Sequence, residues 1–137
     1  MTYEEKLQWF WRYQRALRKE KLLQEELAAQ KKRALGCAAA MDGMPRGVSD
    51  GQSLPRMVES IVKAEQELEC QIKVCGGIRR EVVAAIGRLP DERDQELLRR
   101  RFILGQRWGE ISDRLPMSER HVRRCVRRAV ERIEIDT

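Results

Sequence analysis

Apolar residues recur every three or four positions through the first third of the chain, a spacing that places them on one face of an α-helix. Thr2 and Glu5 have the T-x-x-E spacing of a capping box, in which each side chain accepts a hydrogen bond from the other residue's backbone N–H. No proline follows in this stretch, and Gly36 stands where a helix would stop. The pattern therefore predicts one long amphipathic helix over residues 2–35. Its apolar face holds Leu7, Phe10, Trp11, Leu17, Leu23, Leu27 and Ala34.

A glycine-rich stretch over residues 41–51 separates this helix from a second one. It contains three glycines and one proline, which favour a loop. From Ser53, a candidate N-cap, a heptad pattern of apolar residues continues to Leu89, and only Gln71 interrupts it. The Gly76–Gly77 pair predicts a kink or local break, because each glycine disfavours a helix by up to about 1 kcal/mol relative to alanine. Two long helices and one loop predict an antiparallel, coiled-coil-like hairpin, closed on itself or completed by a second chain.

The composition changes near Leu89–Pro90. All thirteen basic residues from position 88 onward are arginine, whereas residues 1–87 carry seven lysines and eight arginines. We therefore predict two domains, the helical hairpin over residues 1–88 and a second helical module over residues 89–137. The first helix of that module opens with acids and ends with arginines, which is where the helix dipole favours each charge.

A helix-turn-helix pattern occupies the end of this module. Gly105 ends the preceding helix, and a short helix with an apolar face follows over residues 108–115. After a tight turn at Pro116–Met117, Ser118 is the expected N-cap of a last helix that runs to about Ile133. Two helices at this spacing are typical of DNA-binding helix-turn-helix proteins. Since no strand pattern or repeat competes, the whole chain is predicted to be all-α.

The last helix separates an apolar face from an arginine face. It contains six arginines but only two glutamates, so pairing within the helix cannot neutralise it. Guanidinium groups suit phosphates and guanines, and a helix of this length fits a major groove. The net charge of +6 also favours an acidic partner, so we expect contact with double-stranded DNA. The apolar face holds Val122, Cys125, Val126, Ala129 and Ile133, and the arginine face holds Arg120, Arg123, Arg124 and Arg127.

A series of residues across the C-terminal module has a recognisable order. It reads Leu89-Pro90-x-x-Arg93, Leu97-Leu98, Arg101-Phe102, Gly105, Trp108-x-Glu110-Ile111, Leu115, Ser118, Val122, Arg128-Ala129 and Ile133. This series resembles region 4 of bacterial sigma factors, the module that reads the −35 promoter element. With the hairpin and a loop of MPRG-x-SDG character, the chain resembles the small sigma-like late-gene transcription regulators of Gram-positive phages and prophages. Pro116 departs from the family, which commonly has glycine in the turn, because proline cannot supply a left-handed residue.

The resemblance implies roles for eight residues around the start of the last helix. Ser118 caps the helix, while Glu119, Arg120, Arg123 and Arg124 are the expected base readers. Arg127 and Arg128 are expected to hold phosphate, and His121 to contact phosphate or solvent. Glu119 accepts from a cytosine amino group or, equally, is a partner of the helix dipole.

The helix-turn-helix pattern and the arginine face predict a DNA-binding protein. The resemblance implies a sequence-specific transcription regulator, encoded by a phage or prophage and acting with host RNA polymerase. The hairpin would serve homo-oligomerisation or polymerase contact. Two alternatives stay open: a small terminase-like subunit that recognises DNA for packaging, and a polymerase-binding module that never touches DNA. A full sigma factor is not expected, because residues 1–87 lack the organisation of the region that melts the −10 element. The aromatic cluster of Trp9, Phe10, Trp11 and Tyr13 is interpreted as packing.

Other classes of protein are disfavoured. The sequence has no P-loop, glycine-rich nucleotide fingerprint or Ser/His/Asp arrangement, so we expect no enzyme and no cofactor. The four cysteines lack CxxC spacing and His121 is the only histidine, so we expect no metal site. The longest apolar stretches are far below the ~18–20 residues that cross a bilayer, and the first residues are charged. We therefore expect an intracellular protein with no membrane partner, and the resemblance implies the cytoplasm of a bacterial host cell.

Overall fold

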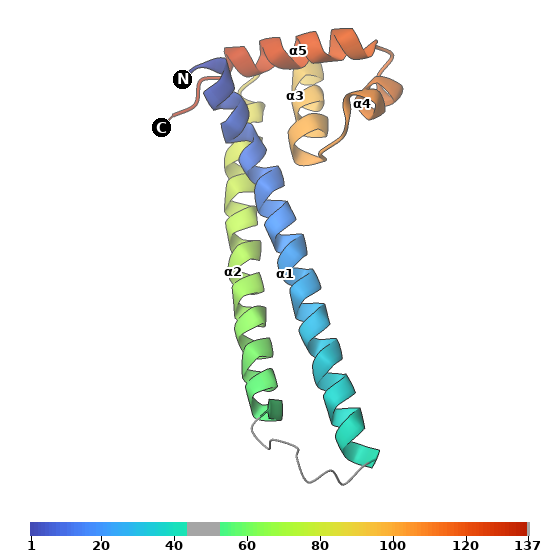
Figure 1. The fold of residues 1–137 in the computed structure, drawn as a ribbon. Helices are drawn as coiled ribbons and strands as arrows, with labels where there is room; N and C mark the ends of the chain where they lie inside the picture. The colour runs from blue at the N-terminus through green and yellow to red at the C-terminus, as the bar shows by residue number, and fades with distance from the viewer. Residues whose placement is uncertain (44–52, 137) are drawn as a thin grey trace. The chain divides into compact units, whose positions relative to one another are not determined.

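The structure, a computed structural model, describes residues 1–43 and 53–136, and their regular structure is entirely helical (Figure 1). This confirms the predicted all-α class. Residues 44–51 of the predicted loop lie outside the described part of the chain. The elements are α1 (Tyr3–Gly43), α2 (Ser53–Gly87), α3 (Glu92–Leu98), the π-helical η1 (Arg99–Ile103), α4 (Trp108–Arg114) and α5 (Glu119–Arg132).

Helix α1 begins as predicted but ends later. The backbone N–H of Glu5 donates to Thr2 Oγ1 and that of Thr2 to Glu5 Oε2, each at 3.2 Å, so the capping box is confirmed. The predicted end at Gly36 is wrong, because α1 continues to Gly43. A glycine ends a helix when it takes a left-handed conformation, and Gly36 does not. Three alanines at positions 38–40, the best helix formers, favour continuation.

Helix α2 runs without a break through Gly76 and Gly77, so the predicted local break is wrong, whereas the kink predicted as its alternative stays a prediction. The side chain of Arg80 folds back over both glycines, with its guanidinium nitrogens 3.7 and 3.9 Å from where their Cβ atoms would lie. The neighbouring positions Cys75 and Val82 are buried. Packing on both sides of the glycine pair therefore outweighs a propensity cost of about 1 kcal/mol per glycine.

The chain forms two compact units, unit 1 with residues 1–17 and 75–137 and unit 2 with residues 18–74. In unit 2, Leu23 of α1 and Gln71 of α2 are buried, and Lys31 Nζ lies 3.7 Å from Glu65 Oε1. Gln71, the predicted interruption of the heptad seam, is thus a buried polar residue. The other seam positions of α2 in this unit are partly buried: Leu54, Met57, Ile61, Ala64 and Leu68.

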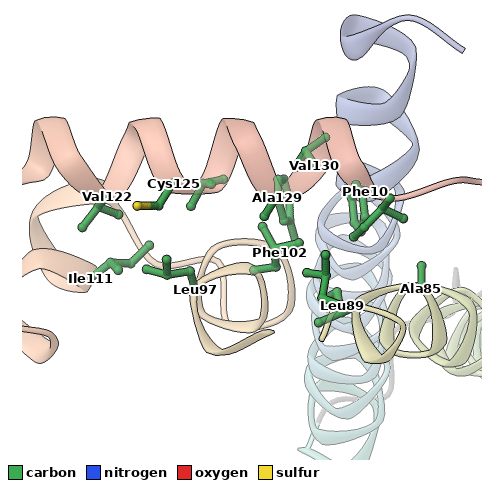
Figure 2. Packing of buried hydrophobic residues seen from close by; sticks show 14 of the residues in the cluster. Phe10, Ala85, Leu89, Leu97, Phe102, Ile111, Val122, Cys125, Ala129 and Val130 are labelled. Carbon is green, nitrogen blue, oxygen red and sulfur yellow. The ribbon is translucent and has the colours of Figure 1, made fainter. Parts of the chain in front are cut away.

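Unit 1 has one hydrophobic core, which joins the start of α1 and the end of α2 to α3, η1, α4 and α5 (Figure 2). Phe10 and Phe102 are both fully buried, and their ring centroids are 5.0 Å apart in a stacked arrangement. Trp11 meets Phe102 edge-on at 4.9 Å. Trp9 and Tyr13 are partly buried against the same core, which confirms that the aromatic cluster packs. Residues before and after Leu89 both contribute side chains to this core. The domain boundary predicted at Leu89–Pro90 stays a prediction.

The first helix of the C-terminal module has a capped start and a π-helical end. Asp91 is its N-cap, with Oδ1 accepting from the Arg93 N–H at 2.9 Å. The helix widens into the π-helical η1 and stops at Gly105, whose φ of +69° confirms the predicted end. The amide Nε2 of Gln14 in α1 donates to the carbonyls of Phe102 and Ile103 at 3.0 and 2.9 Å. A side chain from α1 therefore satisfies carbonyls at this helix end.

Candidate nucleic-acid interface

A short connection joins α4 to α5. Leu115 and Ser118 have extended backbones, with φ, ψ of −120°, 137° and −70°, 154°. Ser112 Oγ donates to the Met117 carbonyl at 2.6 Å, and the Met117 side chain is buried. Among the described residues only Gly105 has a positive φ, so the turn around Pro116 uses no left-handed residue. The proline is accommodated because both flanks of the turn are extended.

Helix α5 begins at the predicted N-cap. Ser118 Oγ accepts from the backbone N–H of His121 at 3.2 Å. The predicted apolar face is buried, and it also includes Val130, which the prediction omitted although it lies one turn beyond Val126. Figure 2 shows side chains of this face directed at Ile111, Leu97 and Phe102. The buried residues are Val122, Cys125, Val126, Ala129, Val130 and Ile133.

The arginines of α5 lie on its exposed side. Within residues 1–43 and 53–136, no carboxylate is within ion-pair distance of Arg120, Arg123 or Arg124. Arg128 has an Nη2–Sγ distance of 3.5 Å to Cys125. A row of cationic groups therefore faces solvent with little internal neutralisation. The exposed residues of the predicted site are Ser118, Glu119, Arg120, His121, Arg123, Arg124, Arg127 and Arg128.

Arg127 differs from the other arginines of this row, because a carboxylate lies within ion-pair distance of its side chain. Its Nε lies 3.0 Å from Glu131 Oε1, and its Cζ lies 4.6 Å from the ring centroid of Tyr3. The hydrogen bond to Glu131 raises the pKa of Arg127. Lys6 Nζ donates to the carbonyl of Glu131 at 2.9 Å. The start of α1 thus borders the second half of α5.

Two other predicted residues have side-chain neighbours in the structure. The Glu119 carboxylate packs against the first turn of α4, with Oε1 3.0 Å from where a Cβ of Gly109 would lie. The ring nitrogens of His121 lie 3.8 and 3.9 Å from Cys125 Sγ. Glu119 therefore lies beside a helix start, and both of its predicted roles, cytosine acceptor and dipole partner, stay predictions.

The sequence did not predict the side chains that support the arginine row from other elements. Arg101 Cζ lies 3.9 Å from the ring centroid of Trp108 and 4.9 Å from that of Trp11. Arg123 Cζ lies 5.7 Å from the same Trp108 ring. Burial lowers the pKa of Arg101, and the positive charge of Arg123 lowers it further. The contact of Arg101 with Trp11 joins distant parts of the chain, and no local pattern reveals it.

Comparisons with known proteins add no assignment to this geometry. No family model, no curated protein and no solved structure matches the chain. None of the described helices is long and apolar enough to span a membrane. Functional inference therefore depends on the residues and contacts of the chain itself.

Proposed function

We propose that this chain is a sequence-specific DNA-binding transcription regulator, in which residues 89–137 act as a sigma region 4-like helix-turn-helix module. The observation that carries the proposal is the arginine row of α5. Arg120, Arg123 and Arg124 are exposed and lack a carboxylate within ion-pair distance among the described residues, while the opposite face of the helix is buried. A buried face fixes the helix on its core, and the exposed face is left for a polyanion.

The dimensions and chemistry of α5 support this proposal. A helix with its side chains is about 10–12 Å across, which matches the ~12 Å width of a DNA major groove, and the 14 residues of α5 make it about 21 Å long. A guanidinium donates two parallel hydrogen bonds to the O6 and N7 atoms of guanine, or binds phosphate oxygens. Arginines without a carboxylate partner give up no ion pair when they bind DNA.

The proposed roles follow position along the helix. Arg120, Arg123 and Arg124 lie in the first two turns after Ser118, where a recognition helix approaches base edges. Arg127 and Arg128 lie further along and would bind phosphate, with His121 at phosphate or solvent. The contacts of Arg127 with Glu131 and Tyr3 favour a supporting role over base reading.

The remaining parts of the proposal concern partners. The sigma-like resemblance suggests a phage or prophage gene, the bacterial cytoplasm, and host RNA polymerase as a partner. Residues 1–88 would mediate self-association or polymerase contact. Val58 and Val62, one turn apart on α2, remain 52% and 46% exposed, which favours a surface for another protein. Sedimentation analysis of a Val58→Glu/Val62→Glu variant would test self-association through this surface, and loss of a wild-type dimer would support it.

The experiment that tests the function measures sequence preference. The full chain selects a duplex from a randomised library, and its affinities for that duplex and for a scrambled duplex are compared by fluorescence anisotropy. Arg124→Ala should lower affinity for the selected duplex roughly 5- to 150-fold. Arg79→Ala is the matched control, because it removes one exposed arginine from α2 and should leave both affinities unchanged.

Two results would overturn the proposal in different ways. Equal affinity for selected and scrambled duplexes would exclude sequence-specific recognition. No effect of Arg124→Ala or Arg123→Ala on DNA binding, together with lost polymerase binding, would favour the protein-interaction alternative. A large ring in mass analysis of the DNA-binding protein would instead favour a packaging subunit.

A further inference from the structure

Four side chains from four elements form a stack of indole rings and guanidinium groups in unit 1, called here the Trp–Arg stack. It consists of Trp11 in α1, Arg101 in η1, Trp108 in α4 and Arg123 in α5. Arg101 lies 4.9 Å from the Trp11 ring centroid and 3.9 Å from that of Trp108, and Arg123 lies 5.7 Å from the latter. The stack thus ends at one of the arginines that we propose to read bases.

Arg101 is the fixed member of the stack. It is partly buried, and its Nη1 donates to the carbonyl of Gln106 at 2.9 Å. An arginine keeps its charge in a protein, so a permanent cation lies against the indole of Trp108. Trp108 is itself partly buried against the core as the first residue of α4. Its ring is therefore held from one side by the core and from another by Arg101.

Arg123 is the exposed member of the stack. Trp108 attracts its guanidinium, since a cation within about 6 Å of a ring centroid is attracted by the ring's quadrupole. Arg101 repels it, because both groups are cations, and the repulsion opposes collapse of Arg123 onto the core. Attraction and repulsion together restrict the rotamers that the long side chain samples. Ordering an arginine costs conformational entropy, and a ring that orders it beforehand reduces this cost on binding.

We propose that Trp108 is a positioning residue for Arg123, so that recognition of the base pair contacted by Arg123 depends on an indole that does not touch DNA itself. This inference rests on the proposed DNA-binding function. Arg124 provides an internal comparison, because it is also exposed on the same helix but has no ring contact among the described residues. Loss of the indole should therefore affect Arg123 and spare Arg124.

The binding test is a pair of double-mutant cycles on the full chain, with a duplex selected from a randomised library as the probe. Trp108→Leu should lower affinity about two- to fivefold, and Trp108→Phe, which keeps a ring, should restore most of it. In an Arg123→Ala background, Trp108→Leu should have no further effect. In an Arg124→Ala background, Trp108→Leu should keep its full effect. If Trp108 had only a structural role, Trp108→Leu would have the same effect in both backgrounds.

A second measurement needs no DNA. In a side-chain NMR spectrum of the wild-type chain, the Nε–H proton of Arg123 should be displaced by the ring current of Trp108, and that of Arg124 should not. Trp108→Met, which replaces the ring with an unbranched side chain of good helix propensity, should return the Arg123 resonance to the position of the Arg124 resonance. Identical Arg123 resonances in wild type and variant would show that the ring does not order this arginine, and would overturn the proposal.

The outcomes separate the positioning role from the proposed function. If Arg123→Ala and Arg124→Ala both weaken specific binding but Trp108→Leu acts additively with each, DNA recognition stands and positioning by Trp108 is wrong. If the wild-type chain binds selected and scrambled duplexes equally, the proposed function is wrong, and the positioning role for base reading is lost with it. Coupling to Arg123 alone, with a displaced Arg123 resonance, supports both.

Discussion

Replacement of Gly105 by alanine tests how the C-terminal module is joined to α1. Gly105 has φ +69°, and a Cβ there would lie 2.7 Å from Gln14 Oε1 and 3.1 Å from its Cδ. A non-glycine residue in a left-handed conformation costs about 1–2 kcal/mol. The Gln14 amide must also move, which breaks its hydrogen bonds to the carbonyls of Phe102 and Ile103. Each of these bonds contributes about 0.5–1.5 kcal/mol to stability. We therefore expect Gly105→Ala to destabilise unit 1 by about 2–5 kcal/mol.

Urea unfolding followed by tryptophan fluorescence measures this effect, because all three tryptophans lie in unit 1. Gly36→Ala is the matched control. Nothing lies within 4 Å of where a Cβ at position 36 would be, and alanine in a helix should leave the free energy of unfolding unchanged or raise it. In a Gln14→Ala background, Gly105→Ala should cost only the backbone part, about 1–2 kcal/mol. A cost below about 0.5 kcal/mol, or full additivity with Gln14→Ala, would refute the reasoning.

Three further predictions concern the core, the N-terminal tyrosine and the arginine row. Phe10→Ala should cost about 3–5 kcal/mol in the same unfolding assay, because Phe10 is fully buried; Trp11→Ala should cost less, because Trp11 is only partly buried. Burial raises the pKa of Tyr3 above its ordinary value of 10.0, so the unfolded chain loses this proton first and the free energy of unfolding falls as the pH rises above that value. Tyr3→Phe should make this decline shallower in urea midpoints measured on both sides of pH 10, and an identical decline would contradict the burial of Tyr3. Arg127→Ala should weaken binding to selected and scrambled duplexes alike and reduce the slope of log K against log salt by about one unit, whereas a loss confined to the selected duplex would make Arg127 a base reader.

The sequence predicted the elements whose signals are local. Helix α5 combines a serine cap with a periodic apolar face, and both features act within a few residues of chain, so its start at Ser118 and its buried side were predictable. The stop at Gly105 was predictable for the same reason. The end of α1 was predicted wrongly because a single glycine is a weak signal, and the following residues decide whether the helix continues.

The supporting contacts of the candidate site were not predictable from one sequence. The π-helical turn at η1 has no local signature, and Gln14, which bonds its carbonyls, lies 88 and 89 positions away from Phe102 and Ile103. The contact of Lys6 with Glu131 joins residues 125 positions apart. A heptad or helix-face pattern reports which side of a helix is buried, but it does not say which other helix buries it.

These long-range contacts make the start of α1 part of the support of α5. Phe102 packs on Phe10 and Trp11, Arg101 stacks on Trp11, and Arg127 lies over Tyr3. A fragment that began at Leu89 would expose the buried face of Phe102 and would leave Arg101 with one indole partner instead of two. The arginine row would keep its sequence but lose contacts that limit its side-chain rotamers, and ordering those side chains on DNA would then cost more. A ligand or protein that displaced the first turns of α1 would act on α5 through these same residues. The N-terminal helix is therefore coupled to the proposed DNA-contacting surface through the core of unit 1, in addition to any role it has in binding a partner.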